Sequence, residues 1–271
     1  MGFTPTWCHD RIMWSSRTLA YVAASVAIIA VGGTSLANSG STTGDISGLS
    51  QIRIMPLGDS VTAGEGSSTG DGYRWHLARY LTDVEHWPAE WVGSQESGQQ
   101  PNRHHEGHSG WRIDQLAGQI AGWIRIQDPD VVLVHAGIND ALQGASGEVM
   151  LQRMALLVKT IVATDPTVEI LIADLVPVRY GTDRDIASIS MQRFNRGLHD
   201  AVATYSQVTI VHWSRAIPNR LLGDGIHPTD EGYLRAAWVW YRCLGALVGD
   251  GVIRAGEDPL PVPVAADALC E

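Results

Sequence analysis

Apolar residues recur along the chain in short runs, with longer segments of helical spacing between them. Two runs, VVLVHAG (131–137) and EILIADLV (169–176), are apolar at consecutive positions. Such runs are typical of parallel strands that are buried on both faces of a sheet. Three more runs of strand length are QIRIMPL (51–57), EWVG (90–93) and VTIVHW (208–213). The pattern therefore predicts five strands.

Between and after these runs, apolar side chains follow one another at three- and four-residue spacing, which predicts helices with one buried face. The predicted helices cover 73–82, 112–125, 147–164, 186–205 and 230–247. Because strands and helices alternate, we expect right-handed crossovers and an α/β fold: a three-layer α/β/α sandwich with a central five-stranded parallel sheet. In such sheets ligands bind at the carboxyl ends of the strands.

The first 37 residues have the pattern of a secretory signal. Arg11 and Arg17 precede an apolar stretch at 19–33, and the small residues Ser35 and Ala37 suit cleavage after Ala37. The alternative is an uncleaved membrane anchor, but a bilayer span needs about 20 apolar residues and this stretch is shorter. We expect a secreted, extracellular protein with no stable membrane association after cleavage.

The rest of the chain predicts one domain. Residues 38–50 are rich in Gly, Ser and Thr and predict a flexible lead-in to a domain at 51–248, with a C-terminal tail at 249–271 packed on it. The first of the three cysteines leaves with the signal. Cys243 and Cys270 remain as a pair in an oxidising compartment, so we expect a disulfide that ties the tail to the last helix. The alternative is two free thiols.

Composition narrows the class of protein. With 45% hydrophobic and 18% charged residues, the chain has the composition of a globular protein. Its formal net charge is −10, and it has no cluster of Lys and Arg. Nucleic acid is therefore excluded as an expected partner, because phosphate binding needs a basic face.

A serine stands directly after the first predicted strand, in IMPLGDSVTAGEG (54–66). The hydroxyl of Ser60 is a poor nucleophile unless a base removes its proton and another group orients that base. Asp224 and His227 lie three residues apart in GDGIHP, before the last helix. At that spacing the carboxylate can hold one imidazole nitrogen while the other faces a serine. The alternative is a turn leading into the helix, with an exposed histidine.

Acyl transfer also needs hydrogen-bond donors for the oxyanion. Asn139 follows the strand in HAGIND, and Gly110 in HEGHSGW can offer an unobstructed backbone N–H. Each has an alternative, since Asn139 can cap the next segment and Gly110 can simply be a turn glycine.

Together these blocks resemble the SGNH hydrolases, also called GDSL esterases, over about residues 51–247. The resemblance rests on four blocks in the family's order: GDS (58–60), the glycine of HSGW (110), GIND (137–140) and DGIHP (224–228). It implies a flavodoxin-like SGNH hydrolase fold with Ser60 as nucleophile, His227 as general base and Asp224 as its orienting acid. It also implies an oxyanion hole made by Ser60, Gly110 and Asn139. The family usually has threonine where this chain has Ile138, which can alter the packing beside Asn139.

A narrower resemblance is to the carbohydrate esterase branch that contains acetylxylan esterases. Its motifs include RIMPLGDSVTAGEGS, HEGHSGWRIDQL and DPDVVLVHAGIND. It implies an acylated carbohydrate as substrate, hydrolysis of short, mainly acetyl, esters through an acyl-enzyme, and no metal or organic cofactor. We expect Trp111, His108 and Tyr180 to bind substrate, with Trp213 as a further aromatic candidate. The alternatives are a lipase or thioesterase for longer acyl chains, and a catalytically silent carbohydrate-binding protein.

Two acidic residues beside the blocks, Asp59 and Asp140, are expected to hold their loops by bonding backbone N–H groups. HHEGH (104–108) gathers histidines and a glutamate but lacks the spacing of a zinc motif. We expect it to be a solvated loop at the substrate entrance. Glu65 and Glu106 receive no role from the sequence.

Overall fold

The structure is a computed structural model that describes residues 51–84, 87–101, 103–178, 181–247 and 268–271. The predicted signal, the lead-in, Tyr180 and most of the C-terminal tail lie outside these residues. All of the described residues fall within one compact unit, Asp45–Glu271.

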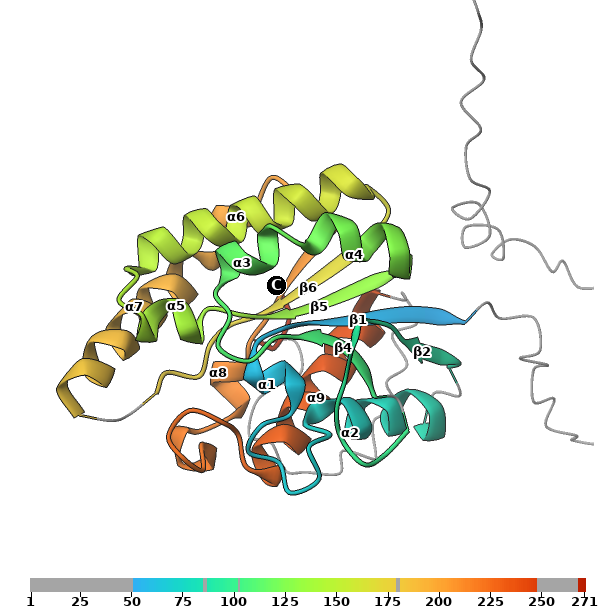
Figure 1. Cartoon of the computed structure of the whole chain (residues 1–271), viewed down its shortest axis with the longest axis horizontal. Coiled ribbons are helices and arrows are strands. Elements are labelled where there is room, and N and C mark those ends of the chain that lie inside the picture. Colours follow the sequence, from blue (N-terminus) through green and yellow to red (C-terminus); the bar gives the residue numbers. More distant parts are fainter. Residues whose placement is uncertain (1–50, 85–86, 102, 179–180, 248–267) are drawn as a thin grey trace, which may run out of the picture. The chain divides into compact units, whose positions relative to one another are not determined.

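A largely parallel sheet forms the central layer of this unit (Figure 1). On one side of β1 lie β5, β6 and β7 in that order, and on its other side lie β2 and β4, all parallel to their neighbours. The two-residue β3 pairs antiparallel with β4 at the edge. The strands are β1 (Ile52–Gly58), β2 (Ala89–Trp91), β3 (Gln95–Glu96), β4 (His104–Gly107), β5 (Val131–His135), β6 (Glu169–Ala173) and β7 (Val208–Val211).

The five predicted strands are all present as parallel strands, so the expected fold class is confirmed. Every residue of β5 is buried, as its run of consecutive apolar residues predicted. The sheet has two strands that the sequence did not predict, β3 and β4. The prediction of a solvated loop at HHEGH is wrong, because residues 104–107 form β4. His105 and Glu106 are buried there. A polar strand can be buried only where its polar groups have partners, and the partners described below come from other segments.

Helices cover both faces of the sheet (Figure 1). One layer contains α3, α4, α5, α6 and α7, which pack against one another, and the other contains α1, α2, α8 and α9. Among the described residues, no helix has the length and apolar character needed to cross a bilayer. The helices are α1 (Ser60–Ala63), α2 (Tyr73–Arg79), α3 (Ile113–Ala117), α4 (Ile120–Gln127), α5 (Ile138–Leu142), α6 (Gly147–Thr164), α7 (Gly181–Val202), α8 (Trp213–Ala216) and α9 (Asp230–Leu247), with a π-helical turn at Tyr80–Val84 and a 3₁₀ turn at Asn219–Leu221.

The helix boundaries follow the sequence pattern closely in two cases. The predicted helices at 147–164 and 230–247 coincide with α6 and α9. The predicted helix at 112–125 is divided into α3 and α4 by a turn at Gly118 and Gln119. Glycine has low helix propensity, which permits this interruption.

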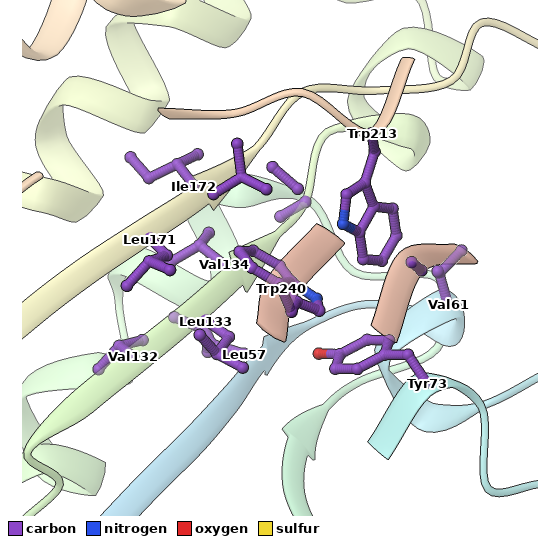
Figure 2. Close-up of a cluster of buried hydrophobic side chains, with 14 of the residues drawn as sticks. Leu57, Val61, Tyr73, Val132, Leu133, Val134, Leu171, Ile172, Trp213 and Trp240 are labelled. Carbon is purple, nitrogen blue, oxygen red and sulfur yellow. The ribbon is translucent and has the colours of Figure 1, made fainter. Parts of the chain in front are cut away.

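An aromatic cluster fills the core between the sheet and α9. Tyr73 meets Trp213 edge to face, with ring centroids 5.6 Å apart, and Trp213 meets Trp240 at 5.5 Å (Figure 2). All three side chains are fully buried. Trp213 therefore belongs to the core, and its consideration as a sugar-binding aromatic residue is wrong.

The described end of the C-terminal tail is attached to β7. The N–H and C=O groups of Ile210 bond with Glu271, and the His212 N–H donates to Leu269 O at 2.9 Å. Cys270 forms a disulfide with Cys243 of α9, as expected from the sequence. The bridge joins the segment 268–271 to the helix that covers this part of the sheet.

Candidate active site

Ser60 lies at the carboxyl end of β1, where it begins α1. Asp59 caps this helix, because its Oδ1 accepts a hydrogen bond from the Val61 N–H at 3.0 Å. Gly58 allows the close approach of β5, since a Cβ at this position would lie 2.1 Å from His135 O. The three residues of the GDS block thus have separate roles. Gly58 lets β5 approach β1, Asp59 caps α1, and Ser60 presents its hydroxyl at the start of that helix.

His227 is held by a tight turn between the 3₁₀ turn and α9. Asp224 Oδ1 accepts hydrogen bonds from the N–H groups of Ile226 (2.9 Å) and His227 (2.8 Å). Gly225, with φ +83°, adopts the left-handed conformation that this turn requires. The turn closes when the Gly223 N–H bonds His227 O at 2.9 Å. The same carboxylate therefore shapes the loop and lies beside the imidazole.

The three predicted catalytic side chains meet in one hydrogen-bonded chain. Ser60 Oγ is 2.9 Å from His227 Nε2, and His227 Nδ1 is 2.7 Å from Asp224 Oδ2. Partial burial raises the pKa of Asp224, but hydrogen bonds from the His227 and Ile226 N–H groups and the imidazole outweigh it and lower the pKa to about 2. A carboxylate that stays ionised can fix the imidazole tautomer and stabilise an imidazolium.

Asn139, in α5, and Gly110, in the turn before α3, belong to neighbouring segments of the same site. Asn139 Nδ2 donates to Trp111 O at 3.0 Å and to Asp59 Oδ2 at 3.3 Å. Gly110 has φ +81°, which favours glycine at this turn, and no heavy atom lies within 4 Å of a Cβ built there. The Ser60 and Gly110 backbones and the Asn139 amide are thus connected through Asp59 and Trp111.

Asp140, also in α5, ties this helix to α3 and α6. Its Oδ2 accepts from the Ile113 N–H at 2.9 Å, and its Oδ1 accepts from Arg153 Nη1 at 2.6 Å. Burial raises the pKa of Asp140 despite these two favourable bonds. The loop-holding roles predicted for Asp59 and Asp140 are confirmed by their backbone hydrogen bonds.

His108 packs in a cluster of three aromatic rings. Its ring stacks on Trp111 and on Trp123, with centroid distances of 4.4 and 4.8 Å, and the two tryptophan centroids are 6.3 Å apart. Its Nε2 is 3.0 Å from Glu106 Oε2, and the Ser94 N–H and Oγ bond the same carboxylate at 2.6 and 2.9 Å. These contacts hold His108 at the start of the turn at 108–111, and its predicted contact with substrate stays a prediction. Trp111 keeps its predicted substrate-binding role as a prediction, and Tyr180 lies outside the described residues.

The sequence missed a second carboxylate in the site. Glu65 Oε2 lies 3.6 Å from His227 Nε2, and Ser109 Oγ donates to Glu65 Oε1. The only feature of the sequence that could have pointed to Glu65 is its position, five residues after Ser60 in a glycine-rich loop.

The histidines of HHEGH have separate partners. His104 lies 3.7 Å from Glu96, His105 bonds Ser97 Oγ, and His108 bonds Glu106. Burial, with a smaller effect of Arg74, lowers the pKa of His105 to about 3. In the part of the chain that the structure describes, no group of three His, Cys, Asp or Glu side chains is arranged to hold a metal ion.

A mostly parallel α/β sheet with hydrogen-bonded serine, histidine and aspartate side chains at its carboxyl edge is the arrangement of a serine hydrolase. The chain belongs to the GDSL-like lipase/acylhydrolase family, whose model matches residues 57–235. It is 31% identical to a Clostridium thermocellum family 3 carbohydrate esterase of known structure, covering 74% of this chain and 98% of that one, with a TM-score of 0.65.

Two further relatives extend the comparison. A family 3 carbohydrate esterase from Talaromyces cellulolyticus shares the fold, with 23% identity, coverage of 74% and 99%, and a TM-score of 0.63. A multidomain esterase of Ruminococcus flavefaciens is 26% identical over 77% of this chain. The present chain spans only 30% of the length of that relative.

Proposed function

We propose that this protein is a secreted serine esterase that removes short acyl groups, chiefly acetyl, from carbohydrate hydroxyls. The proposal is carried by the hydrogen-bonded chain from Ser60 through His227 to Asp224, with distances of 2.9 and 2.7 Å. The 31% identity to a carbohydrate esterase supports the substrate class. Export rests on the signal pattern at 1–37 alone, and N-terminal sequencing of protein from the culture medium tests it.

In the proposed mechanism, Ser60 Oγ attacks the carbonyl carbon while His227 Nε2 takes the hydroxyl proton. Asp224 stabilises the imidazolium through Nδ1. The tetrahedral intermediate then collapses, the bond to the alcohol oxygen breaks, and Nε2 gives that oxygen its proton. A water molecule attacks the acyl-enzyme, passes its proton to Nε2, and releases the carboxylic acid as Ser60 regains its hydrogen.

The proposed oxyanion donors are the Ser60 N–H, the Gly110 N–H and Asn139 Nδ2. Both hydrogens of Nδ2 are engaged in this structure. We expect the 3.3 Å bond to Asp59 to be released first, because it is the longer of the two. We expect the planar amide then to turn as a unit about the Cβ–Cγ bond, which directs the released hydrogen to the substrate.

The test of the nucleophile uses Ser60→Ala and p-nitrophenyl acetate. The variant is expected to lose turnover and labelling by a fluorophosphonate probe, and a Ser60→Ala protein with full turnover would refute the assignment. Absence of probe labelling in the wild type would favour the silent binding protein.

The substrate class is tested separately. Wild-type protein should release acetate from acetylated xylan and prefer acetyl over decanoyl model esters. Preference for the decanoyl ester would instead favour a lipase or thioesterase.

A further inference from the structure

Glu65 places a negative charge beside the nitrogen that handles the proton in the proposed reaction. Its Oε2 is 3.6 Å from His227 Nε2, the same atom that lies 2.9 Å from Ser60 Oγ. Asp224, by contrast, bonds the opposite nitrogen of the ring. The imidazole is therefore flanked by two carboxylates, and only Asp224 has a role in the proposed triad.

The backbone around Glu65 is fixed against α1, α9 and the turn that carries His227. Its N–H donates to Ser60 O at 3.0 Å, and its carbonyl oxygen accepts from the Tyr233 hydroxyl at 2.5 Å. The next residue, Gly66, has φ +88°, and a Cβ there would lie 2.7 Å from His227 Cβ. The loop thus packs directly on His227, which limits where the Glu65 side chain can lie.

The two oxygens of the Glu65 carboxylate differ in their surroundings. Oε1 accepts from Ser109 Oγ, which holds the side chain toward the turn that contains Gly110. The 3.6 Å separation between Oε2 and His227 Nε2 is longer than a normal hydrogen bond. Since the side chain is 50% exposed, Oε2 keeps lone pairs that a substrate donor can reach from solvent.

The position of the leaving alcohol follows from the proposed function, on which this inference rests. His227 Nε2 must give a proton to the ester oxygen, so that oxygen has to lie within hydrogen-bond distance of Nε2. In a sugar ester the hydroxyl on the neighbouring carbon, staggered beside the ester oxygen, lies close to it. That hydroxyl is then brought near Glu65 Oε2.

We propose that Glu65, held by Ser109, accepts a hydrogen bond from the hydroxyl next to the scissile ester. The preferred substrates are accordingly monoesters of vicinal diols, the class to which partly acylated sugars belong. A simple alkyl ester leaves the carboxylate without this donor. Hydrogen bonds to charged groups are stronger than neutral ones, although exposure of the site weakens this one.

The experiment compares kcat/KM for two acetates that differ in one donor: 2-hydroxyethyl acetate and 2-methoxyethyl acetate. The wild type should prefer the hydroxyl compound about tenfold. Glu65→Ala should bring the ratio close to one, and Glu65→Gln should retain part of it because the amide oxygen still accepts. Ser109→Ala should lower the ratio by releasing the carboxylate.

Glu96→Gln is the matched control, because Glu96 is 51% exposed and lies near Arg103 and His104 at the sheet edge. It should leave the ratio unchanged. The inference would be overturned by a wild-type ratio near one, or by a wild-type ratio that Glu65→Ala retains. It would also be overturned if Glu65→Ala lost kcat/KM equally on both acetates, because the carboxylate would then act on His227. Turnover of p-nitrophenyl acetate and probe labelling of Ser60 separate this failure from the absence of serine esterase activity, which would abolish both in the wild type. Preference for the decanoyl ester identifies the other failure of the proposed function, a lipase or thioesterase.

Discussion

Asp59 and Asn139 meet inside the site although neither belongs to the chain from Ser60 to Asp224. One oxygen of Asp59 caps the helix that presents Ser60, and the other accepts from Asn139 Nδ2. Burial raises the pKa of Asp59 to about 7. A single buried carboxyl group thus connects the nucleophile's helix to the amide proposed for the oxyanion hole.

Replacing Asn139 by alanine should therefore affect the reaction more than the fold. We expect Asn139→Ala to lower kcat by about 10²- to 10³-fold on p-nitrophenyl acetate, as loss of one oxyanion donor does elsewhere. Asn195→Ala provides the contrast, because Asn195 bonds the Leu175 backbone N–H and C=O at 2.9 and 2.7 Å. It should mainly lower the unfolding free energy. An Asn139→Ala enzyme with unchanged kcat would exclude the oxyanion role.

Among the elements, β1 and β5 approach each other closely where β1 ends. A Cβ on Gly58 would lie 2.1 Å from the His135 carbonyl oxygen and 2.5 Å from Thr62 Oγ1. The carbonyl belongs to a strand of the central sheet, so it has little freedom to move. This contact determines where the chain leaves β1 and where Ser60 begins α1.

Gly58→Ala should therefore lower both stability and activity. We expect a loss of about 1–3 kcal/mol in the unfolding free energy, as overpacked sites show, measured by urea denaturation. Activity should fall as well, because Ser60 shifts. Gly122→Ala in α4 is the control: nothing lies within 4 Å of its built Cβ, so it should stabilise the helix by up to about 1 kcal/mol. Equal stability of the two variants would contradict the packing explanation.

Sequence pattern predicted some elements well and missed others for a physical reason. α6 repeats its apolar residues at helical spacing, so its bounds were readable. β4 contains HHEG, which has no apolar pattern. It is a strand because its backbone pairs with β1 and β3, while Ser94 and Ser97 bond the buried side chains of Glu106 and His105. Pairing between separate segments leaves no periodic signal.

At the scale of the whole molecule, the disulfide joins two segments that are far apart in the sequence. Cys243 and Cys270 are separated by 27 positions. Closing a loop of this length restricts the unfolded chain, which typically contributes about 2–4 kcal/mol. The Cys243→Ser/Cys270→Ser double variant should lose stability of this order in urea denaturation. Dithiothreitol should destabilise the wild type similarly and leave the double variant unchanged; a wild type insensitive to reduction would argue against the contribution.

The stability of the molecule should also depend on pH through His135, which is buried and stacks on Trp213 at 4.4 Å. Its Nδ1 has no hydrogen-bond partner among the described residues. Burial lowers the pKa of His135 from 6.5 to about 3. Between these values the unfolded chain binds a proton that the folded chain does not, so this residue's effect on stability becomes unfavourable as the pH falls below 6.5.

His135→Phe keeps an aromatic ring against Trp213 and removes the titrating group. The unfolding free energy of the variant minus that of the wild type should be about 2–3 kcal/mol larger at pH 4.5 than at pH 7.5. Urea denaturation at both pH values measures this difference. If the unfolding free energies of the variant and the wild type differ by the same amount at both pH values, His135 does not cause the acid sensitivity.

The sequence by itself determined the five parallel strands, most helices and the residues of the proposed triad. These features have local signals, because burial gives the strands continuous apolar runs and the helices an apolar period, and GDS and DGIHP are short contiguous blocks. Only the tertiary structure decided that Glu65 lies beside His227, that His108 packs against two tryptophans, and that most of β4 is buried. Each of these depends on side chains from separate loops meeting, and the spacing along the chain does not specify such contacts.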